Sequence, residues 1–91
     1  MKIVKINSLG CPSCIIMNKV FNKIKEKYTF ELEEYDYDFD DIEKFIPGNI
    51  LPIYIFYKDD KETNRICGEH KIEEIEKIIE EMKWKKYYTW Y

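Results

Sequence analysis

The chain has 91 residues, a formal net charge of −3 from 15 basic and 18 acidic side chains, and 45% hydrophobic residues. This length supports one domain. The charge balance excludes DNA or RNA binding through a general basic field, and no window approaches the ~20 apolar residues that span a bilayer. Three cysteines are too few for a fold held together by several disulfides, and an odd number cannot all pair within one chain. Two of them form the segment Cys11-Pro12-Ser13-Cys14, whose spacing needs an explanation.

The first half of the chain begins with a predicted strand at Lys2–Asn7, which is apolar on both faces like a central strand of a sheet. A turn follows, and then a helix that begins at Pro12 and fades around Lys27. Proline suits the first turn of a helix, because its fixed φ angle is helical and its missing N–H is not needed there. Apolar residues recur at helical spacing at Met17, Val20, Phe21 and Ile24.

The pattern next predicts a strand at Thr29–Asp38, with a phase slip that indicates a bulge or the strand end, and a short helix at Asp40–Phe45. A dense β run at Pro52–Tyr57 and a returning strand at Glu62–Cys67 form a hairpin. The last helix is predicted at Lys71–Lys83, with isoleucines on one face and glutamates on the other. The order of elements is therefore β-α-β-α-β-β-α.

This order predicts an α/β fold, because a strand, a crossover helix and a strand form a parallel pair with a right-handed connection. The hairpin adds two antiparallel strands, and the last helix covers the sheet. We expect a three-layer α/β/α sandwich around a four-stranded mixed sheet, formed by residues 1–82. Residues 83–91 are an aromatic and basic tail, which either folds back or frays, or docks on a partner or a membrane interface.

The Cys-x-x-Cys pair at a helix start points to thiol chemistry. The first sulfur lies beside unsatisfied backbone N–H groups and the positive end of the helix dipole. Both favour the thiolate and lower the pKa of Cys11, and the thiolate is the form that attacks disulfides. Cys14 lies one helical turn further on, within reach of a mixed disulfide. The sequence therefore predicts Cys11 as the nucleophile and Cys14 as the resolving thiol.

A family resemblance rests on four segments: Cys11–Cys14 after a strand, residues 36–40 (Asp-Tyr-Asp-Phe-Asp), Ile50-Leu51-Pro52 opening a strand, and Cys67-Gly68 before the last helix. Over residues 1–82 the chain resembles the thioredoxin/glutaredoxin superfamily. This resemblance implies a thioredoxin-like fold and a thiol–disulfide oxidoreductase that needs no cofactor. It also implies that Pro52 is cis and lies against the active-site sulfurs.

The resemblance further implies that the backbone of Leu51 pairs with a bound substrate, and that Pro12 and Ser13 complete the substrate-binding surface around Cys11 and Cys14. The expected partners are disulfide-containing proteins and a reductase or low-molecular-weight thiol. We expect a cytoplasmic monomer that neither binds nucleic acid nor spans a membrane.

The chain departs from both branches of the superfamily. Gly10 stands where thioredoxins have the tryptophan of their Trp-Cys-Gly-Pro-Cys motif, and Lys5 stands where they bury an acid. Glutaredoxins favour Cys-Pro-Tyr-Cys, which is closer to this motif. However, Ile50-Leu51-Pro52 and Gly68-Glu69 differ from the Thr-Val-Pro and Gly-Gly-x-Asp segments with which glutaredoxins bind glutathione.

Other readings of these residues stay open. The cysteine pair could instead carry copper or zinc, or bind an iron–sulfur cluster, although we assign no metal ligand. Cys67 is either a core residue or an auxiliary thiol, because its strand should end near the edge of the sheet that holds Cys11. His70 is interpreted as an ordinary residue of the N-terminus of the last helix.

Overall fold

The computed structural model describes the backbone of residues 1–88 and the side chains of residues 1–83. Its four strands are β1 (Lys2–Asn7), β2 (Glu31–Asp36), β3 (Ile53–Lys58) and β4 (Lys61–Cys67). They form one mixed sheet in the order β2-β1-β3-β4, in which β1 and β2 are parallel and β3 is antiparallel to β1 and β4. The predicted α/β fold, with the element order β-α-β-α-β-β-α and a four-stranded mixed sheet, is confirmed.

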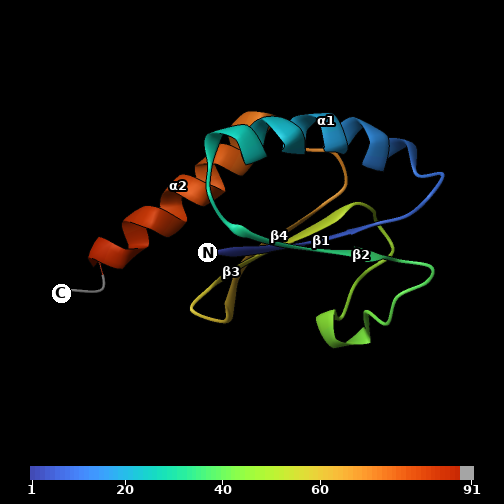
Figure 1. The fold of residues 1–91 in the computed structure, drawn as a ribbon. Helices are drawn as coiled ribbons and strands as arrows, with labels where there is room; N and C mark the ends of the chain where they lie inside the picture. Colours follow the sequence, from blue (N-terminus) through green and yellow to red (C-terminus); the bar gives the residue numbers. More distant parts are fainter. Residues whose placement is uncertain (89–91) are drawn as a thin grey trace.

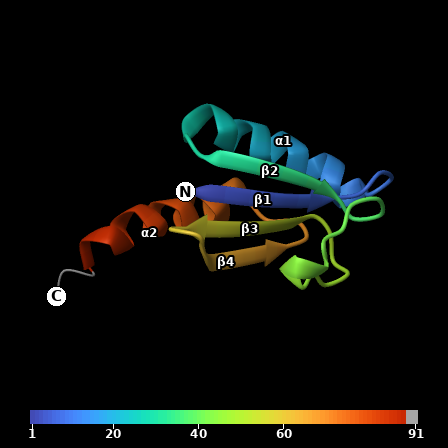
Figure 2. The same ribbon diagram turned by 60° about the horizontal axis from the view of Figure 1, so that its bottom comes forward.

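Two long helices, α1 (Pro12–Lys27) and α2 (Ile72–Tyr88), cover one face of the sheet, and the short 3₁₀ helix η1 (Glu43–Phe45) covers the other (Figure 1). The loops after β1 and β2 gather at one end of the sheet with the segment that leads into β3 (Figure 2). This end holds the N-terminus of α1 and therefore the Cys-x-x-Cys motif.

The core has two halves, because successive side chains of a strand point to opposite faces of the sheet. Ile3 of β1 faces the helices, and its neighbour Val4 faces η1. The half beneath the helices consists of Ile3, Met17, Phe21, Ile24, Tyr28, Tyr54, Phe56, Ile75, Ile79 and Met82. The half beneath η1 consists of Val4, Ile6, Ile42, Phe45, Ile53 and Ile55.

The strand β2 is shorter than the predicted Thr29–Asp38, because polar side chains divert the backbone into a turn. The carboxylate of Asp36 accepts a hydrogen bond from the N–H of Asp38 at 2.8 Å, and the Asp36 carbonyl accepts one from the N–H of Asp40 at 3.0 Å. The helix predicted at Asp40–Phe45 is only the three-residue η1. It stops where Ile46 adopts a left-handed backbone conformation with φ of 50°.

The hairpin of β3 and β4 contains a bulge that the sequence pattern did not indicate. Phe56 pairs with Asn64 and Tyr57 pairs with Glu62, so Thr63 is an extra residue in β4. Its hydroxyl donates to the carbonyl of Phe56 at 3.2 Å. The extra residue increases the local twist of the two strands, as bulges do.

The helix α2 continues past the predicted end at Lys83, and its backbone runs to Tyr88. In both ribbon views its C-terminal part extends beyond the sheet (Figures 1 and 2). The side chains of residues 84–88 and all of residues 89–91 lie outside the described part of the structure. The interpretation of residues 83–91 as a docking or interface segment therefore stays a prediction.

Candidate active site

The cysteine pair lies at the N-terminus of α1. Cys11 is the N-cap residue of the helix and Cys14 is in its first turn, with the two Cα atoms 5.2 Å apart and the two sulfurs within bonding distance. The backbone N–H of Cys14 donates to Sγ of Cys11 at 3.1 Å. Cys11 is half-buried, whereas Cys14 is only 3% exposed. The more accessible sulfur is thus also the one that receives a helix N–H group.

The residues around the motif favour a sharp turn before Cys11 and the start of a helix directly after it. Gly10 has a φ angle of +76°, a conformation that residues with a Cβ rarely adopt, so the chain can turn sharply before Cys11. Pro12 occupies the first turn of the helix, as predicted. The carbonyl of Cys11 accepts hydrogen bonds from the N–H groups of Cys14 at 3.1 Å and Ile15 at 3.3 Å, which closes the first turn.

The segment before β3 lies at the same end of the sheet. The Leu51–Pro52 peptide bond is cis, as the resemblance implied. Pro52 is buried, and its carbonyl accepts a hydrogen bond from the N–H of Gly68 at 2.9 Å. This bond joins the start of β3 to the end of β4, so Cys67 does end its strand near this edge, as predicted.

Cys67 is a half-buried free thiol. It lies opposite Ile53 in the β3–β4 register and packs against the half of the core beneath η1. These contacts explain Cys67 as a packing residue at the end of a strand.

Two carboxylates beside the motif were missed by the sequence analysis. The Ser13 hydroxyl donates to Oε2 of Glu69 at 3.2 Å, and the Ser8 hydroxyl donates to Oδ2 of Asp38. Both contacts join residues at least 30 positions apart in the chain. The segment that follows β2 is acidic, which is the sequence signal for Asp38, whereas the segment before α2 carries no such signal for Glu69.

Lys5 lies beneath α1 and is the only buried charged residue among those described, at 7% exposure. Its ammonium group donates to Glu34 on β2 at 3.3 Å and lies 5.4 Å from the centre of the Phe21 ring. Next to it in the sheet, the buried hydroxyl of Tyr54 has no hydrogen-bond partner. Burial raises the pKa of Tyr54 far above its ordinary value. At the position where thioredoxins bury an acid, this chain therefore holds a cation paired with a carboxylate.

His70 connects β4 to α2 and makes two hydrogen bonds through its ring. Nδ1 lies 2.8 Å from Oε2 of Glu74, and Nε2 lies 3.0 Å from the carbonyl oxygen of Cys67. Both partners are acceptors, so only the protonated imidazolium can donate to both. The hydrogen bond to Glu74 is the main reason that the pKa of His70 is raised above its usual value.

A pH-dependent stability follows from this contact. Because the folded-state pKa of His70 is raised, the contribution of His70 to stability is complete below the unfolded pKa of ~6.5 and is lost as pH rises through the folded value. The free energy of unfolding of wild type minus that of His70→Gln should be larger at acidic than at alkaline pH. The difference should stay within about 1 kcal/mol, because the pair is near the surface. Urea denaturation of both proteins across this pH range measures it, and a pH-independent difference would contradict the assignment.

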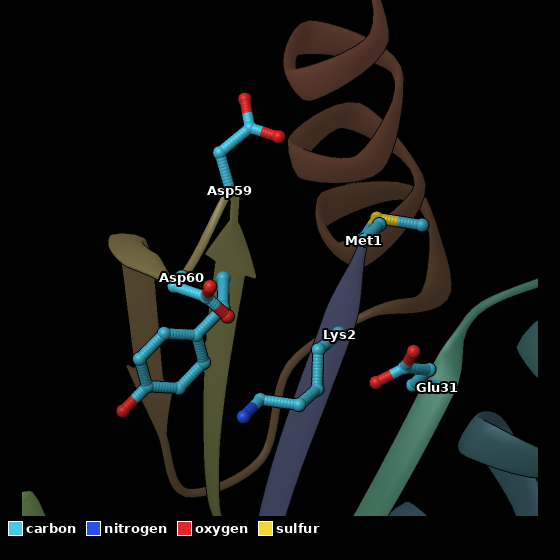
Figure 3. Close-up of a pocket in the computed structure, with 6 residues that line it drawn as sticks. Met1, Lys2, Glu31, Asp59 and Asp60 are labelled. Atoms are coloured by element: carbon cyan, nitrogen blue, oxygen red, sulfur yellow. The ribbon is translucent and has the colours of Figure 1, made fainter.

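Away from the cysteines, the described residues form shallow pockets that no cysteine or histidine lines. A shallow pocket of about 120 Å³ lies at the end of the sheet away from the cysteines (Figure 3), lined by Met1, Lys2, Glu31, Tyr57, Asp59 and Asp60. The described residues contain no group of three or more His, Cys, Asp or Glu side chains placed to hold a metal ion. Within the same residues, no helix is long and apolar enough to cross a membrane.

Solved thioredoxin structures resemble this fold closely. The thioredoxin NaTrxh from Nicotiana alata superposes with a TM-score of 0.76 at 28% identity, covering 88% of this chain and 70% of that one. A reduced thioredoxin pre-protein from Schistosoma mansoni superposes with a TM-score of 0.76 at 21% identity, covering 88% of this chain and 76% of that one. Thioredoxin 1 from Thermosipho africanus superposes with a TM-score of 0.74 at 21% identity, covering 90% of this chain and 93% of that one. The glutaredoxin-like features of the sequence stay predictions.

No family model matches the sequence, and no curated protein matches it. The assignment therefore rests on the fold and on the cysteine pair. The interpretation of that pair as a metal carrier gains no support from either. Together, the fold and the close Cys11–Cys14 pair place this chain in the thioredoxin-like superfamily.

Proposed function

We propose that the protein is a dithiol–disulfide oxidoreductase that reduces or exchanges disulfides of proteins or small molecules. The observation that carries this proposal is the pair of sulfurs within bonding distance at the N-terminus of α1, with the N–H of Cys14 directed at Cys11. That N–H and the helix dipole favour the Cys11 thiolate, which is the nucleophile in thiol–disulfide exchange. The likeness to thioredoxins supports the same chemistry.

In the reductive direction, the Cys11 thiolate attacks one sulfur of a substrate disulfide. An S–S bond forms between Cys11 and that sulfur, and the second substrate sulfur leaves as a thiolate that takes up a proton. Cys14 then loses its proton and attacks Sγ of Cys11, which releases the first substrate sulfur as a thiolate. Two electrons pass from the dithiol to the substrate, and the Cys11–Cys14 disulfide remains. An external dithiol or a reductase restores the pair.

The remaining predicted site residues form the surroundings of this reaction. Pro12 is exposed in the first turn of α1 and Ser13 is half-buried beside it. Leu51 is half-buried before the cis bond to Pro52. We propose that these four residues shape the surface on which the substrate disulfide lies, with the Leu51 backbone pairing with the substrate chain.

A reductase is the proposed electron donor. One of the similar structures is a complex of ferredoxin:thioredoxin reductase with thioredoxin f2, which shows that a protein of this fold docks on such an enzyme. We further propose that the protein is a monomer of the cytoplasm, a compartment in which thiols are kept reduced. Its role there would be in cell redox homeostasis.

The proposal is tested by the reduction of insulin disulfides with dithiothreitol as the source of electrons. Wild type should accelerate the precipitation of the insulin B chain well above the rate with dithiothreitol alone, and Cys67→Ser should retain this activity. A protein that leaves the rate unchanged but binds Cu(I) or Zn(II) stoichiometrically through Cys11 and Cys14 would overturn the proposal in favour of a metal carrier.

A further inference from the structure

Two carboxylates flank the cysteine pair. The Ser8 hydroxyl, in the turn before Cys11, donates to Asp38, and the Ser13 hydroxyl, within the motif, donates to Oε2 of Glu69 at 3.2 Å. Asp38 follows β2 and Glu69 precedes α2, so the two acids come from different halves of the chain. Serines on both sides of the proposed nucleophile in the chain therefore each bind a carboxylate.

Few basic side chains offset these acids at this end of the molecule, and those that lie near it have other partners: Arg65 pairs with Glu62, and His70 pairs with Glu74. The one lysine between β2 and β3, Lys44, belongs to η1, and its ammonium group lies over the rings of Tyr35 and Phe45, at 5.6 and 5.1 Å from their centres. The segment after β2 carries further carboxylates at residues 40, 41 and 43. Lysine and arginine are absent from residues 6–18, 36–43, 45–57 and 66–70.

Exposed apolar side chains lie on the same segments as the cysteine pair and before the strand that follows the cis bond. Leu9, two residues before Cys11, is 79% exposed, and Ile15, directly after Cys14, is 61% exposed. Ile50 is 61% exposed, and its Cγ2 lies only 3.3 Å from the position that a Cβ would take on Gly68. Ile50 thus lies beside Gly68, the residue that precedes Glu69. Large apolar residues grouped on a surface beside reactive groups are typical of a binding surface.

We propose that this surface, formed by Leu9, Ile15, Ile50, Asp38 and Glu69, selects cationic substrates: polypeptides whose disulfide is flanked by lysine or arginine and by an apolar residue. The inference rests on the proposed function and adds the substrate class to it. The apolar side chains bury a substrate residue, while the two carboxylates attract positive charge toward Cys11. Such charge complementarity acts mainly on the rate of association, and so on kcat/KM.

Three disulfide peptides that are identical except for lysine, glutamine or glutamate beside each cysteine test this inference. With the reduced wild-type protein, kcat/KM for the lysine peptide should exceed that for the glutamate peptide on the order of tenfold at low salt. The ratio should shrink at high salt, because the two carboxylates are exposed and salt screens exposed charges. The glutamine peptide should give an intermediate value.

The double variant Asp38→Asn and Glu69→Gln removes both charges and keeps the shape and one acceptor oxygen of each side chain. Its kcat/KM should fall for the lysine peptide and rise for the glutamate peptide, which a purely structural role could not produce. The matched control is the double variant Asp59→Asn and Asp60→Asn, in the hairpin turn at the opposite end of the sheet (Figure 3). This control should keep the wild-type preference.

The outcomes separate this inference from the proposed function. Equal rates for the three peptides, or a preference for the glutamate peptide, would overturn the inference while leaving the oxidoreductase activity established. A variant that slows the lysine and glutamate peptides equally would also overturn it, because the two acids would then act on the thiols and not on substrate charge. Failure to reduce any of the peptides would overturn the proposed function and this inference with it.

Discussion

Replacing Cys11 with serine should reduce insulin reduction to the uncatalysed rate measured with dithiothreitol alone. The hydroxyl of serine is far less acidic than a thiol and forms no disulfide, so the first exchange step cannot occur. The helix itself should persist, because serine is a good N-cap residue and can accept the same N–H of Cys14 that Cys11 accepts. The loss is therefore expected to be chemical and not structural.

The matched control for this substitution is Cys67→Ser, which removes the one free thiol outside the motif. Far-ultraviolet circular dichroism and the denaturation midpoint establish that each variant is folded before its activity is compared. Wild-type turnover in folded Cys11→Ser would show that Cys11 is not the nucleophile.

Replacing Phe21 with alanine should have the largest effect on stability. The Phe21 side chain is 1% exposed, and its ring centre lies 5.0 Å from that of Tyr54 and 5.7 Å from that of Phe30. The ring therefore joins α1 to β3 and to the residue that precedes β2. Truncating such a buried ring costs about 3–5 kcal/mol, which is a large part of the ~5–15 kcal/mol that stabilises a typical domain.

Urea denaturation with the cysteine pair reduced measures this cost. The matched control is Asn22→Ala, the neighbouring residue of the same helix, whose side chain is exposed. It should change the free energy of unfolding by no more than about 0.5 kcal/mol. A Phe21→Ala protein as stable as Asn22→Ala would show that α1 does not pack on the sheet as described.

The sequence predicted the central elements well because they carry strong local patterns. β1 is apolar on both faces, α1 has its buried residues at helical spacing, and the Cys-x-x-Cys segment lies between the two. The end of β2 was predicted less well, because its Asp36 turns the chain through hydrogen bonds to residues two and four positions further on. A strand pattern does not encode such bonds.

The surroundings of the cysteines could not be predicted in the same way. The Ser8–Asp38 and Ser13–Glu69 contacts join residues 30 and 56 positions apart, so they exist only once the sheet has brought three loops to one end. The burial of Lys5 likewise depends on Glu34 being its partner in the parallel register of β1 and β2. Strand registers across a crossover leave no local signal in a single sequence.

In the proposed reaction, Cys11 attacks a disulfide and Cys14 resolves the intermediate. The most direct test is to incubate Cys14→Ser with a peptide disulfide and to locate any adduct by intact mass and peptide mapping. Because serine cannot resolve the mixed disulfide, this protein should accumulate one peptide bound to Cys11, while wild type accumulates none and becomes oxidised. An adduct on Cys67 alone, or no adduct with wild type remaining fully reduced, would contradict the account.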